Sequence, residues 1–259
     1  MNTLEEPEEV DHSRMDLLAY HQAVVTPTME ACLKLILPTL CQRALHGDMG
    51  ITLIDLQKSK FPFSCSVHKH QLADTIHLQT EDNWEEPYYL IHSDDRSFYC
   101  ESDSMGYKYL MDCTPDEREQ FEMIYILRLK NRDGSFSVYL FRTYQLLSDE
   151  TGIPWILCTE TTHLAMCKVE NFQPYRQFCL VSKERGEVIK RFDAANKKEF
   201  SELQLERIQH VGKIKGSEVA QKVFRSKQTV RNSNIDIFKR LNVSTSSDAK
   251  LLAKWLKIT

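Results

Sequence analysis

The stretch Gly216–Leu241, GSEVAQKVFRSKQTVRNSNIDIFKRL, has the pattern of two short amphipathic helices joined by a tight turn. The first helix places three apolar residues on one face at helical spacing: Val219, Ala220 and Val223. Ser226 can cap the second helix, because its hydroxyl accepts a backbone N–H that the helix leaves unpaired. The second helix repeats the apolar pattern with Val230, Ile237 and Leu241. We therefore expect the two helices to pack as a pair.

The other face of the second helix is polar, with basic and amide side chains and no acidic residue before Asp236. Amide and basic side chains of this kind suit phosphates and the major-groove edges of bases. This arrangement is typical of a helix-turn-helix whose second helix contacts double-stranded DNA. The alternative is a plain helical hairpin with one solvated face. The residues expected to contact DNA are Lys227, Gln228, Thr229, Arg231, Asn232, Asn234 and Lys239.

The flanking sequence extends this pair to four helices. Upstream, an amphipathic helix is predicted from the apolar residues Phe200, Leu203, Ile208 and Val211. Downstream, Thr245–Asp248 has the spacing of a capping box, with Asp where Glu or Gln is usual. A last helix follows, and its apolar residues are Leu251, Leu252, Trp255 and Leu256.

The four-helix unit resembles the LuxR-type (GerE-like) DNA-binding domain over about the last sixty residues. The matching residues are Ser201, Glu206, Ile208, Glu218-Val219-Ala220, Ser226, Thr229-Val230-Arg231, Ile237, Lys239, Leu241-Asn242-Val243 and Ala249. The resemblance implies a transcriptional regulator that binds paired half-sites as a homodimer. The chain departs from the family pattern at Leu203-Gln204, at Ser233 where a His is usual, at Ile235, and in a short turn at 212–216. These departures favour a rival hypothesis, a protein-interaction module with a degenerate helix-turn-helix.

Composition places the chain among soluble globular proteins, with 42% hydrophobic and 27% charged residues in a length of 259. No apolar run approaches the roughly eighteen residues of a membrane span. Residues 1–14 are acidic and polar, unlike a signal peptide. We therefore expect a cytoplasmic protein without a membrane partner. The eight Cys residues form no C-x-x-C pair, so we expect them to be reduced.

Charge is distributed unevenly along the chain. Residues 197–259 hold ten Lys and four Arg against six acidic residues, a net charge of +8. The whole chain has a net charge of −4, so the first 196 residues carry −12. A basic C-terminal part beside an acidic body favours contact with a polyanion through that part alone.

The N-terminal third predicts helices followed by two strands. Residues 13–45 have a helical apolar pattern that Pro27 and Pro38 should break into pieces, since proline cannot donate the helical hydrogen bond. These helices would serve either protomer pairing or ordinary packing. Gly50–Leu56 is predicted as a first strand with Phe63–Val67 as its partner, and residues 68–119 as short helices and loops.

Three longer strands are predicted next, at Phe121–Leu129, Phe136–Leu147 and Ile153–Thr161. The turns between them are Asn131–Gly134 and Asp149–Gly152, which carry hairpin signals. Two short strands, a helical patch and three long antiparallel strands resemble the PAS sensor domain. His92–Arg96 is similar to the segment that often leads out of the PAS helices. A second hairpin is predicted from Phe178–Ser182 and Val188–Phe192.

The predicted fold class is α+β, a PAS-like antiparallel sheet with flanking helices followed by an all-α four-helix domain. The predicted organisation is an N-terminal helical segment (1–46), a PAS-like sensor domain (47–165), a connector with a β-hairpin (166–199) and a LuxR-type helix-turn-helix domain (200–259). The PAS resemblance implies that a small molecule or a partner is sensed by the N-terminal part. Aromatic residues that could line its ligand pocket are Trp84, Tyr88, Phe98 and Tyr107, although such residues also form ordinary cores.

Other ligand chemistries have weaker support. Trp84-x-x-x-Tyr88 followed by Asp94 is similar to the pocket of acyl-homoserine-lactone quorum-sensing receptors, with a short spacing to the Asp. No Cys lies in the setting that a flavin-binding PAS domain requires, and no cofactor is expected. His68, His70 and His77 have metal-ligand spacing that solvated loop histidines explain equally well. We find no P-loop and no Ser-His-Asp order, and therefore predict that the chain is not an enzyme.

Overall fold

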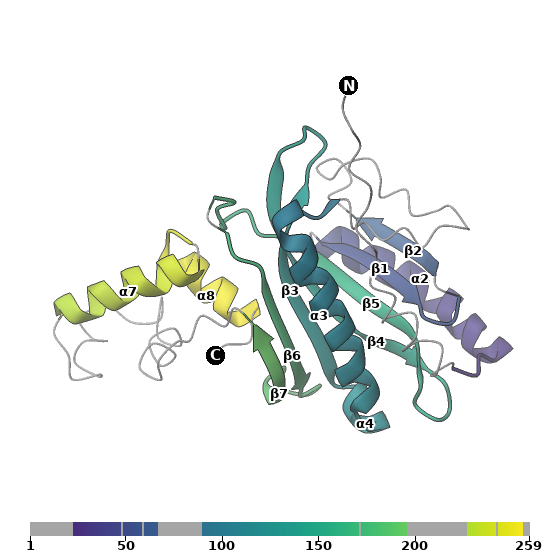
Figure 1. Ribbon diagram of the computed structural model, residues 1–259. Helices are drawn as coiled ribbons and strands as arrows, with labels where there is room; N and C mark the ends of the chain where they lie inside the picture. The colour runs from purple at the N-terminus through teal and green to yellow at the C-terminus, as the bar shows by residue number, and fades with distance from the viewer. Residues whose placement is uncertain are drawn as a thin grey trace.

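Seven antiparallel strands form one sheet at the centre of the molecule (Figure 1). The computed structural model describes residues 23–47, 49–58, 60–66, 90–170, 172–195, 227–241 and 243–255. The strands are β1 (Gly50–Asp55), β2 (Lys60–Ser66), β3 (Phe121–Lys130), β4 (Phe136–Ser148), β5 (Pro154–His163), β6 (Tyr175–Val181) and β7 (Val188–Ala195). Their order across the sheet is β2-β1-β5-β4-β3-β6-β7. The mixed α+β class and the five strands from β1 to β5 agree with the prediction.

Two tight turns set the register of the three long strands, as their sequences indicated. Gly134 has φ +84° and Gly152 has φ +80°, a left-handed conformation that glycine adopts without steric cost. The N–H of Gly134 donates to the Asn131 carbonyl at 3.1 Å, and the N–H of Gly152 donates to the Asp149 carbonyl at 3.0 Å. Gly152 is also crowded, because an added Cβ would lie 2.5 Å from the Cβ of Pro115. A side chain at Gly152 would therefore be disfavoured for both reasons.

The hairpin predicted inside the connector is part of the sheet. Phe121 to Ile126 of β3 pair with β6 in antiparallel register, and β6 pairs in turn with β7. Six of the seven β6 residues are buried, so apolar residues cover both of its faces. A strand buried on both faces needs a partner on each side for its backbone groups, and β3 and β7 provide them. The sheet therefore continues beyond residue 165, into the segment that the sequence assigned to a connector.

Helix α3 (Ser93–Asp112) covers one face of the sheet (Figure 1). The expectation of only short helices and loops between residues 68 and 119 is wrong for this segment. Its buried face alternates apolar residues with Asp95, Ser102 and Asp103, and these polar residues hide the helical period in the sequence. Gly106 lets the helix approach the sheet closely, because an added Cβ would lie 2.7 Å from the Sδ of Met123.

A short helix, α4 (Pro115–Arg118), follows α3 and closes its C-terminal end. Thr114 and Glu117 form a capping box at the start of α4. The guanidinium of Arg118 donates to the carbonyls of Leu110 and Met111 in the last turn of α3 and to the Gly152 carbonyl. These three bonds connect the end of α3 to the turn between β4 and β5.

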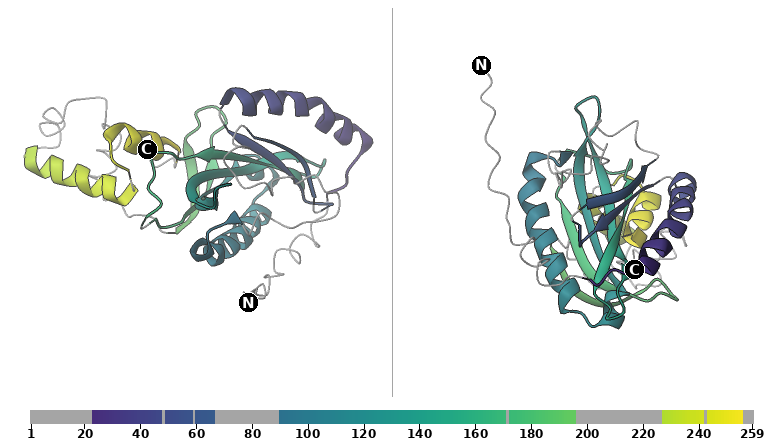
Figure 2. Two further views of the ribbon diagram at one scale, coloured as in Figure 1. Left: turned by 90° about the horizontal axis from the view of Figure 1, so that it is seen from above. Right: turned by 90° about the vertical axis from the view of Figure 1, so that its right-hand side faces the viewer.

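The opposite face of the sheet is covered in part by α2 (Pro27–Gly47), as the two views of Figure 2 show. Pro27 begins this helix, but the prediction that Pro38 breaks it is wrong, because α2 continues through Pro38. Pro38 lies on the exposed side of the helix, where water can satisfy the carbonyl that a proline leaves without a partner. Leu40 and Ala44 pack instead on β1 and β5, against a cluster that includes Ile51, Leu53 and Cys158. None of the described helices combines the length and apolarity that crossing a membrane requires.

Two helices are described near the C-terminus, α7 (Lys227–Leu241) and α8 (Ser246–Trp255). They correspond to the predicted recognition helix and the predicted last helix. The two preceding helices of the expected four-helix unit lie outside the described residues. Buried residues of α7 and α8 belong to the same apolar cluster as Ile126 of β3, Val138 of β4 and Phe172.

We expect Asp149 to stabilise the turn between β4 and β5 through its charge. Its carboxylate accepts hydrogen bonds from the backbone N–H groups of Val24, Thr151 and Ile153. Burial works against its ionisation, but these bonds and the Thr151 hydroxyl outweigh it and hold the pKa of Asp149 below its ordinary value. Replacing Asp149 with Ala should lower the free energy of unfolding by roughly 1.5–3 kcal/mol, the worth of a hydrogen bond to a charged group.

Because the pKa of Asp149 is lowered by folding, its contribution is present above the unfolded pKa of about 3.9 and is lost as the pH falls through the folded value. Urea unfolding at pH 7 and at pH 3 measures this difference. Asp133→Ala is the matched control, since Asp133 occupies the other hairpin turn but is exposed and accepts its hydrogen bonds from neighbours within that turn, among them the N–H and the hydroxyl of Ser135. Equal losses for the two variants at pH 7 would contradict this role for Asp149.

Candidate functional site

The outer face of α7 is polar in the structure, as the sequence predicted. Of the seven residues expected to contact DNA, five have exposed side chains: Gln228, Thr229, Arg231, Asn232 and Lys239. Asn234 is half-buried, and the side chain of Lys227 lies outside the described part of the chain. The structure therefore brings most of these residues to one accessible helix surface.

Residues on this surface are spaced one helical turn apart. Gln228, Asn232, Ile235 and Lys239 follow one another at intervals of three or four residues, which places them along one side of the helix. The Nε2 of Gln228 donates to the Oδ1 of Asn232 at 2.9 Å, so the two amides hold each other in place. Amide and guanidinium groups on one helix side can donate and accept hydrogen bonds at base edges.

The inner face of α7 packs against α8. Ile237 and Leu241 of α7 and Ala249, Leu252 and Ala253 of α8 are buried in one cluster. At the start of α8, the N–H of Asp248 donates to the Thr245 hydroxyl at 3.1 Å, and that hydroxyl donates to the Asp248 carboxylate at 2.7 Å. The predicted cap at Thr245–Asp248 is confirmed in this form. Burial of the inner face leaves the polar face of α7 as the accessible one.

One apolar residue interrupts the polar surface of α7. Ile235 is 57% exposed and lies between Asn232 and Lys239 on the same side of the helix. An exposed isoleucine cannot hydrogen-bond to a phosphate or a base edge, although it can contact a thymine methyl group or an apolar patch of a protein. This residue is the feature of α7 that suits a protein partner.

The predicted ligand-pocket residues separate into two groups. Phe98 and Tyr107 lie on α3 and pack in the apolar cluster between that helix and the sheet. Tyr107 is fully buried there, and the guanidinium of Arg176 lies over the Phe98 ring at 5.4 Å from its centroid. Trp84 and Tyr88 lie outside the described residues. The structure thus buries Tyr107 between α3 and the sheet, whereas Phe98, nine residues earlier on the same helix, is half-buried on a different side of it.

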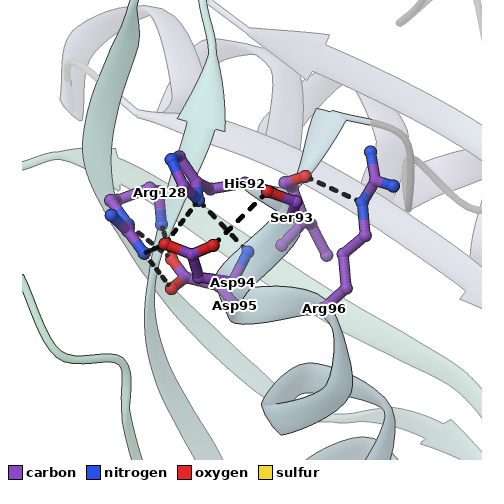
Figure 3. A network of polar contacts seen from close by, with 7 residues as sticks. His92, Ser93, Asp94, Asp95, Arg96 and Arg128 are labelled. Carbon is purple, nitrogen blue, oxygen red and sulfur yellow. Dashed lines mark hydrogen bonds and ion pairs between the residues drawn. The ribbon is translucent and has the colours of Figure 1, made fainter.

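Asp94 is the acidic residue of the sequence pattern that is similar to the acyl-homoserine-lactone pocket. In the structure it belongs to a polar network at the start of α3 (Figure 3). Its side chain is 70% exposed, and its carboxylate lies 3.4 Å from the Nη2 of Arg128 on β3. His92 precedes the helix and accepts the N–H of Asp94 at its Nδ1, which makes His92 the cap of α3. The network therefore connects the first turn of the helix to the sheet.

The stronger partner of Arg128 is Asp95, which the sequence analysis did not single out. Arg128 donates from Nε to one oxygen of Asp95 at 3.0 Å and from Nη2 to the other at 2.6 Å. The backbone N–H of Arg128 adds a third bond to the same carboxylate at 3.0 Å (Figure 3). Asp95 is fully buried, and its hydrogen bonds raise the pKa of Arg128 above the ordinary value. A buried bidentate pair of this kind positions α3 on β3 and leaves little of its charge for a ligand.

No metal-binding cluster emerges from the described residues. Among them, no three His, Cys, Asp or Glu side chains are grouped so that they could hold a metal ion. The candidate ligands His68, His70 and His77 lie in a part of the chain that the structure does not describe.

Comparisons with known proteins give only distant similarities. No protein-family model matches the chain, and no curated protein matches it. Among solved structures, the complex of Vibrio cholerae VqmA with ligand and DNA is 11% identical, with a TM-score of 0.31 over 81% of this chain and 82% of that chain. A phage VqmA bound to DPO is 9% identical, with a TM-score of 0.31 over 87% of this chain and 91% of that chain.

A third similar structure is the Vibrio cholerae VqmA dimer in the absence of target DNA, described with LuxR-type receptors. It is 12% identical, with a TM-score of 0.29 over 81% of this chain and 83% of that chain. At TM-scores near 0.3 the superposition is too poor to assign this chain to a family or to transfer a function to it. The function must therefore be argued from its own residues.

We expect the Asp95–Arg128 pair to be essential for the attachment of α3. Asp95→Ala leaves a buried guanidinium without its main partner and should lower the free energy of unfolding by about 3–5 kcal/mol. Asp94→Ala is the matched control, because the exposed neighbour contacts the same guanidinium and should cost at most about 1 kcal/mol. Denaturant unfolding of the two variants measures both values, and a loss for Asp94→Ala as large as that for Asp95→Ala would refute this assignment.

Proposed function

We propose that this chain is a sequence-specific DNA-binding transcriptional regulator in which α7 is the recognition helix. The observation that carries this proposal is the two-sided character of α7. The helix buries Ile237 and Leu241 against α8 while its outer side exposes Arg231, Asn232 and Lys239 without an exposed carboxylate among them. A rigidly packed helix with such a surface can enter the major groove.

Within this proposal the polar residues of α7 have different tasks. Arg231 and Asn232 can offer paired hydrogen bonds to a guanine or an adenine edge. Lys227 and Thr229, at the N-terminal end of the helix, are suited to phosphate contacts that fix the register on the duplex. Gln228 is bonded to Asn232 and can keep that amide oriented toward a base. The net charge of +8 over residues 197–259 adds sequence-independent attraction to DNA.

The N-terminal part is proposed to be a PAS-like sensor that acts on the DNA-binding part. Supporting this is the succession of β1, β2, α3 and the three long strands β3, β4 and β5, which is the order that the PAS resemblance implied. A small molecule in this domain would contact Trp84, Tyr88, Phe98 and Tyr107. The proposed protein is cytoplasmic, has no cofactor and catalyses no reaction.

The proposed regulator is a homodimer, since a single helix-turn-helix contacts one half-site and two half-sites require two copies. The exposed Leu35 and Leu45 of α2 are suited to this pairing. Leu252 of α8 is buried against α7 and packs within its own chain.

The alternative function is a protein-interaction module, and the exposed Ile235 is the observation that favours it. Ser233, where the resembling family has a His, points the same way. In this case α7 would dock on a protein through Ile235, and its contacts with DNA would be weak and independent of sequence.

Selection of bound sequences from random duplex DNA supplies a site on which the recognition helix can be tested. On that site Arg231→Ala should cost roughly 1–3 kcal/mol of binding free energy and relax the preference at one base position. Lys227→Ala should weaken binding to all duplexes alike and lower the slope of affinity against salt by about 1. Titration of labelled duplexes at several salt concentrations measures both effects.

The control is Lys250→Ala, which removes an exposed positive charge from α8 rather than from the proposed recognition helix. This variant should keep the base preference. If Arg231→Ala retains wild-type affinity and preference while circular dichroism shows a folded protein, α7 does not recognise DNA. Loss of a protein partner on Ile235→Ser with DNA binding unchanged would establish the interaction module instead.

A further inference from the structure

A groove of about 630 Å³ opens beside α2, at the end of the sheet where β3 begins. Charged and hydroxyl side chains from four elements form part of its lining. These are Arg43 of α2, Glu122 of β3, Arg142 and Tyr144 of β4, and Glu160 of β5. The turn between β6 and β7 closes another side with Ser182, Lys183 and Gly186. The volume is within the range of roughly 300–1,000 Å³ that is typical of small-molecule sites.

Two arginines and two glutamates alternate along this lining. Arg142 donates to both oxygens of Glu122, at 2.9 and 3.4 Å, and to one oxygen of Glu160 at 3.4 Å. The other oxygen of Glu160 forms an ion pair with Arg43 and accepts the Tyr144 hydroxyl at 2.9 Å. The Nη1 of Arg43 also donates to the Tyr144 hydroxyl, at 3.2 Å. The network is neutral in total, so the positions of its charges decide what it can bind.

The positive charges of this network lie at the surface and the negative charges lie beneath them. The side chain of Arg43 is 50% exposed, whereas that of its partner Glu160 is 5% exposed. The side chain of Arg142 is 30% exposed, whereas that of Glu122 is 12% exposed. The lining also contains Lys183 and Glu119, which are 61% and 55% exposed and form an ion pair with each other. A solute that enters the groove therefore meets two guanidinium groups whose own partners, Glu160 and Glu122, are more deeply covered.

Both arginines keep hydrogen-bond donors for a ligand. A guanidinium has five N–H groups, and with partners among the described residues Arg142 uses three bonds and Arg43 two. Burial works against the charge of Arg142, but Glu122 and Glu160 outweigh it and raise its pKa above the ordinary value. Burial also raises the pKa of Tyr144, which keeps its hydroxyl protonated and bonded to Glu160. Arg142 therefore stays charged and Tyr144 stays neutral around neutral pH.

We propose that this groove is a binding site for a small oxyanion, a carboxylate or phosphate compound held by Arg43 and Arg142. The planar fork of a guanidinium matches the two oxygens of either group, and two forks from different elements can clamp one ligand. The ligand would also connect α2 to the central strand β4. The site lies on the α2 side of the sheet, away from α3 with its residues Phe98 and Tyr107, and it does not depend on the proposed DNA binding.

The experiment titrates the full-length protein with sodium succinate, with sodium phosphate and with succinamide by calorimetry, and sodium chloride keeps the ionic strength constant. Wild-type protein should show saturable binding of succinate, of phosphate or of both, and none of the uncharged succinamide. Binding of one anion alone identifies the ligand class as carboxylate or as phosphate. Absence of saturable binding for both anions, or equal binding of succinamide, would overturn the proposal.

Arg43→Gln tests the role of the more exposed guanidinium, because Glu160 keeps Arg142 and Tyr144 as partners in this variant. This variant should bind the anion with roughly tenfold lower affinity, the usual effect of losing a hydrogen bond to a charged group. Arg43→Lys keeps the charge without the planar fork and should have an intermediate affinity. It also provides a second test if the Gln variant does not fold.

The matched control is Arg132→Gln, which removes an exposed arginine from the turn at the opposite end of β3. This variant should bind the anion as the wild type does. A purely structural network predicts lower thermal stability for the Arg43 variants and no anion binding by any of the proteins. Wild-type affinity in both Arg43 variants, or an equal loss in Arg132→Gln, would show that these cations do not form the site.

Discussion

Strand β3 is buried on both of its faces, and this constraint determines where the rest of the chain must pack. Eight of its ten residues are buried, so each face needs a covering layer. Met123, Tyr125 and Leu127 pack toward α3, whereas Ile124 and Ile126 belong to the cluster on the other face. Pairing with β4 on one side and β6 on the other satisfies the backbone of β3. A central strand with both faces and both edges covered explains why the hairpin of β6 and β7 joins the sheet.

Burial of this sheet also explains its paired charges. An ionised side chain that leaves water loses solvation worth several kcal/mol, which a well-placed partner must offset. Arg128 of β3 donates to Asp95 of α3. Arg176 of β6 forms ion pairs with Glu101 of α3 at 2.8 Å and with Asp193 of β7 at 3.1 Å. These pairs connect α3 and β7 to the central strands. Pairs of this type fix the position of a helix on a sheet even where they add little net stability.

The network of Arg43, Arg142, Glu122 and Glu160 differs from the Asp95–Arg128 pair in one respect. Asp95 and Arg128 are both buried, so each charge is paired with the other and neither is accessible to a ligand. In the groove the carboxylates of Glu160 and Glu122 are 5% and 12% exposed, whereas the guanidinium groups of Arg43 and Arg142 that they partner are 50% and 30% exposed. An ion pair between an Arg and an acidic residue can therefore connect two elements or present a positive charge to a ligand. How exposed the Arg side chain is decides between the two roles. Helix α7 likewise has two different faces: its apolar face is buried against α8, and its polar face is exposed.

The sequence by itself determined the elements whose signals are local. Alternating apolar residues located the strands from β1 to β5, and the Gly134 and Gly152 turns located their connections, because a left-handed turn residue is a property of a few adjacent positions. Spacing of Ile237, Leu241 and Leu252 likewise indicated the buried faces of α7 and α8. Only the tertiary structure decided features that join distant residues. The α3 helix was missed because Asp95 and Ser102 lie on its buried face and make sense only with Arg128 and Arg176 as partners. The pairing of β6 with β3 and the groove beside α2 both depend on residues that are far apart in the sequence. Arg43 and Tyr144, for example, are 101 positions apart, and no local pattern specifies a contact over that separation.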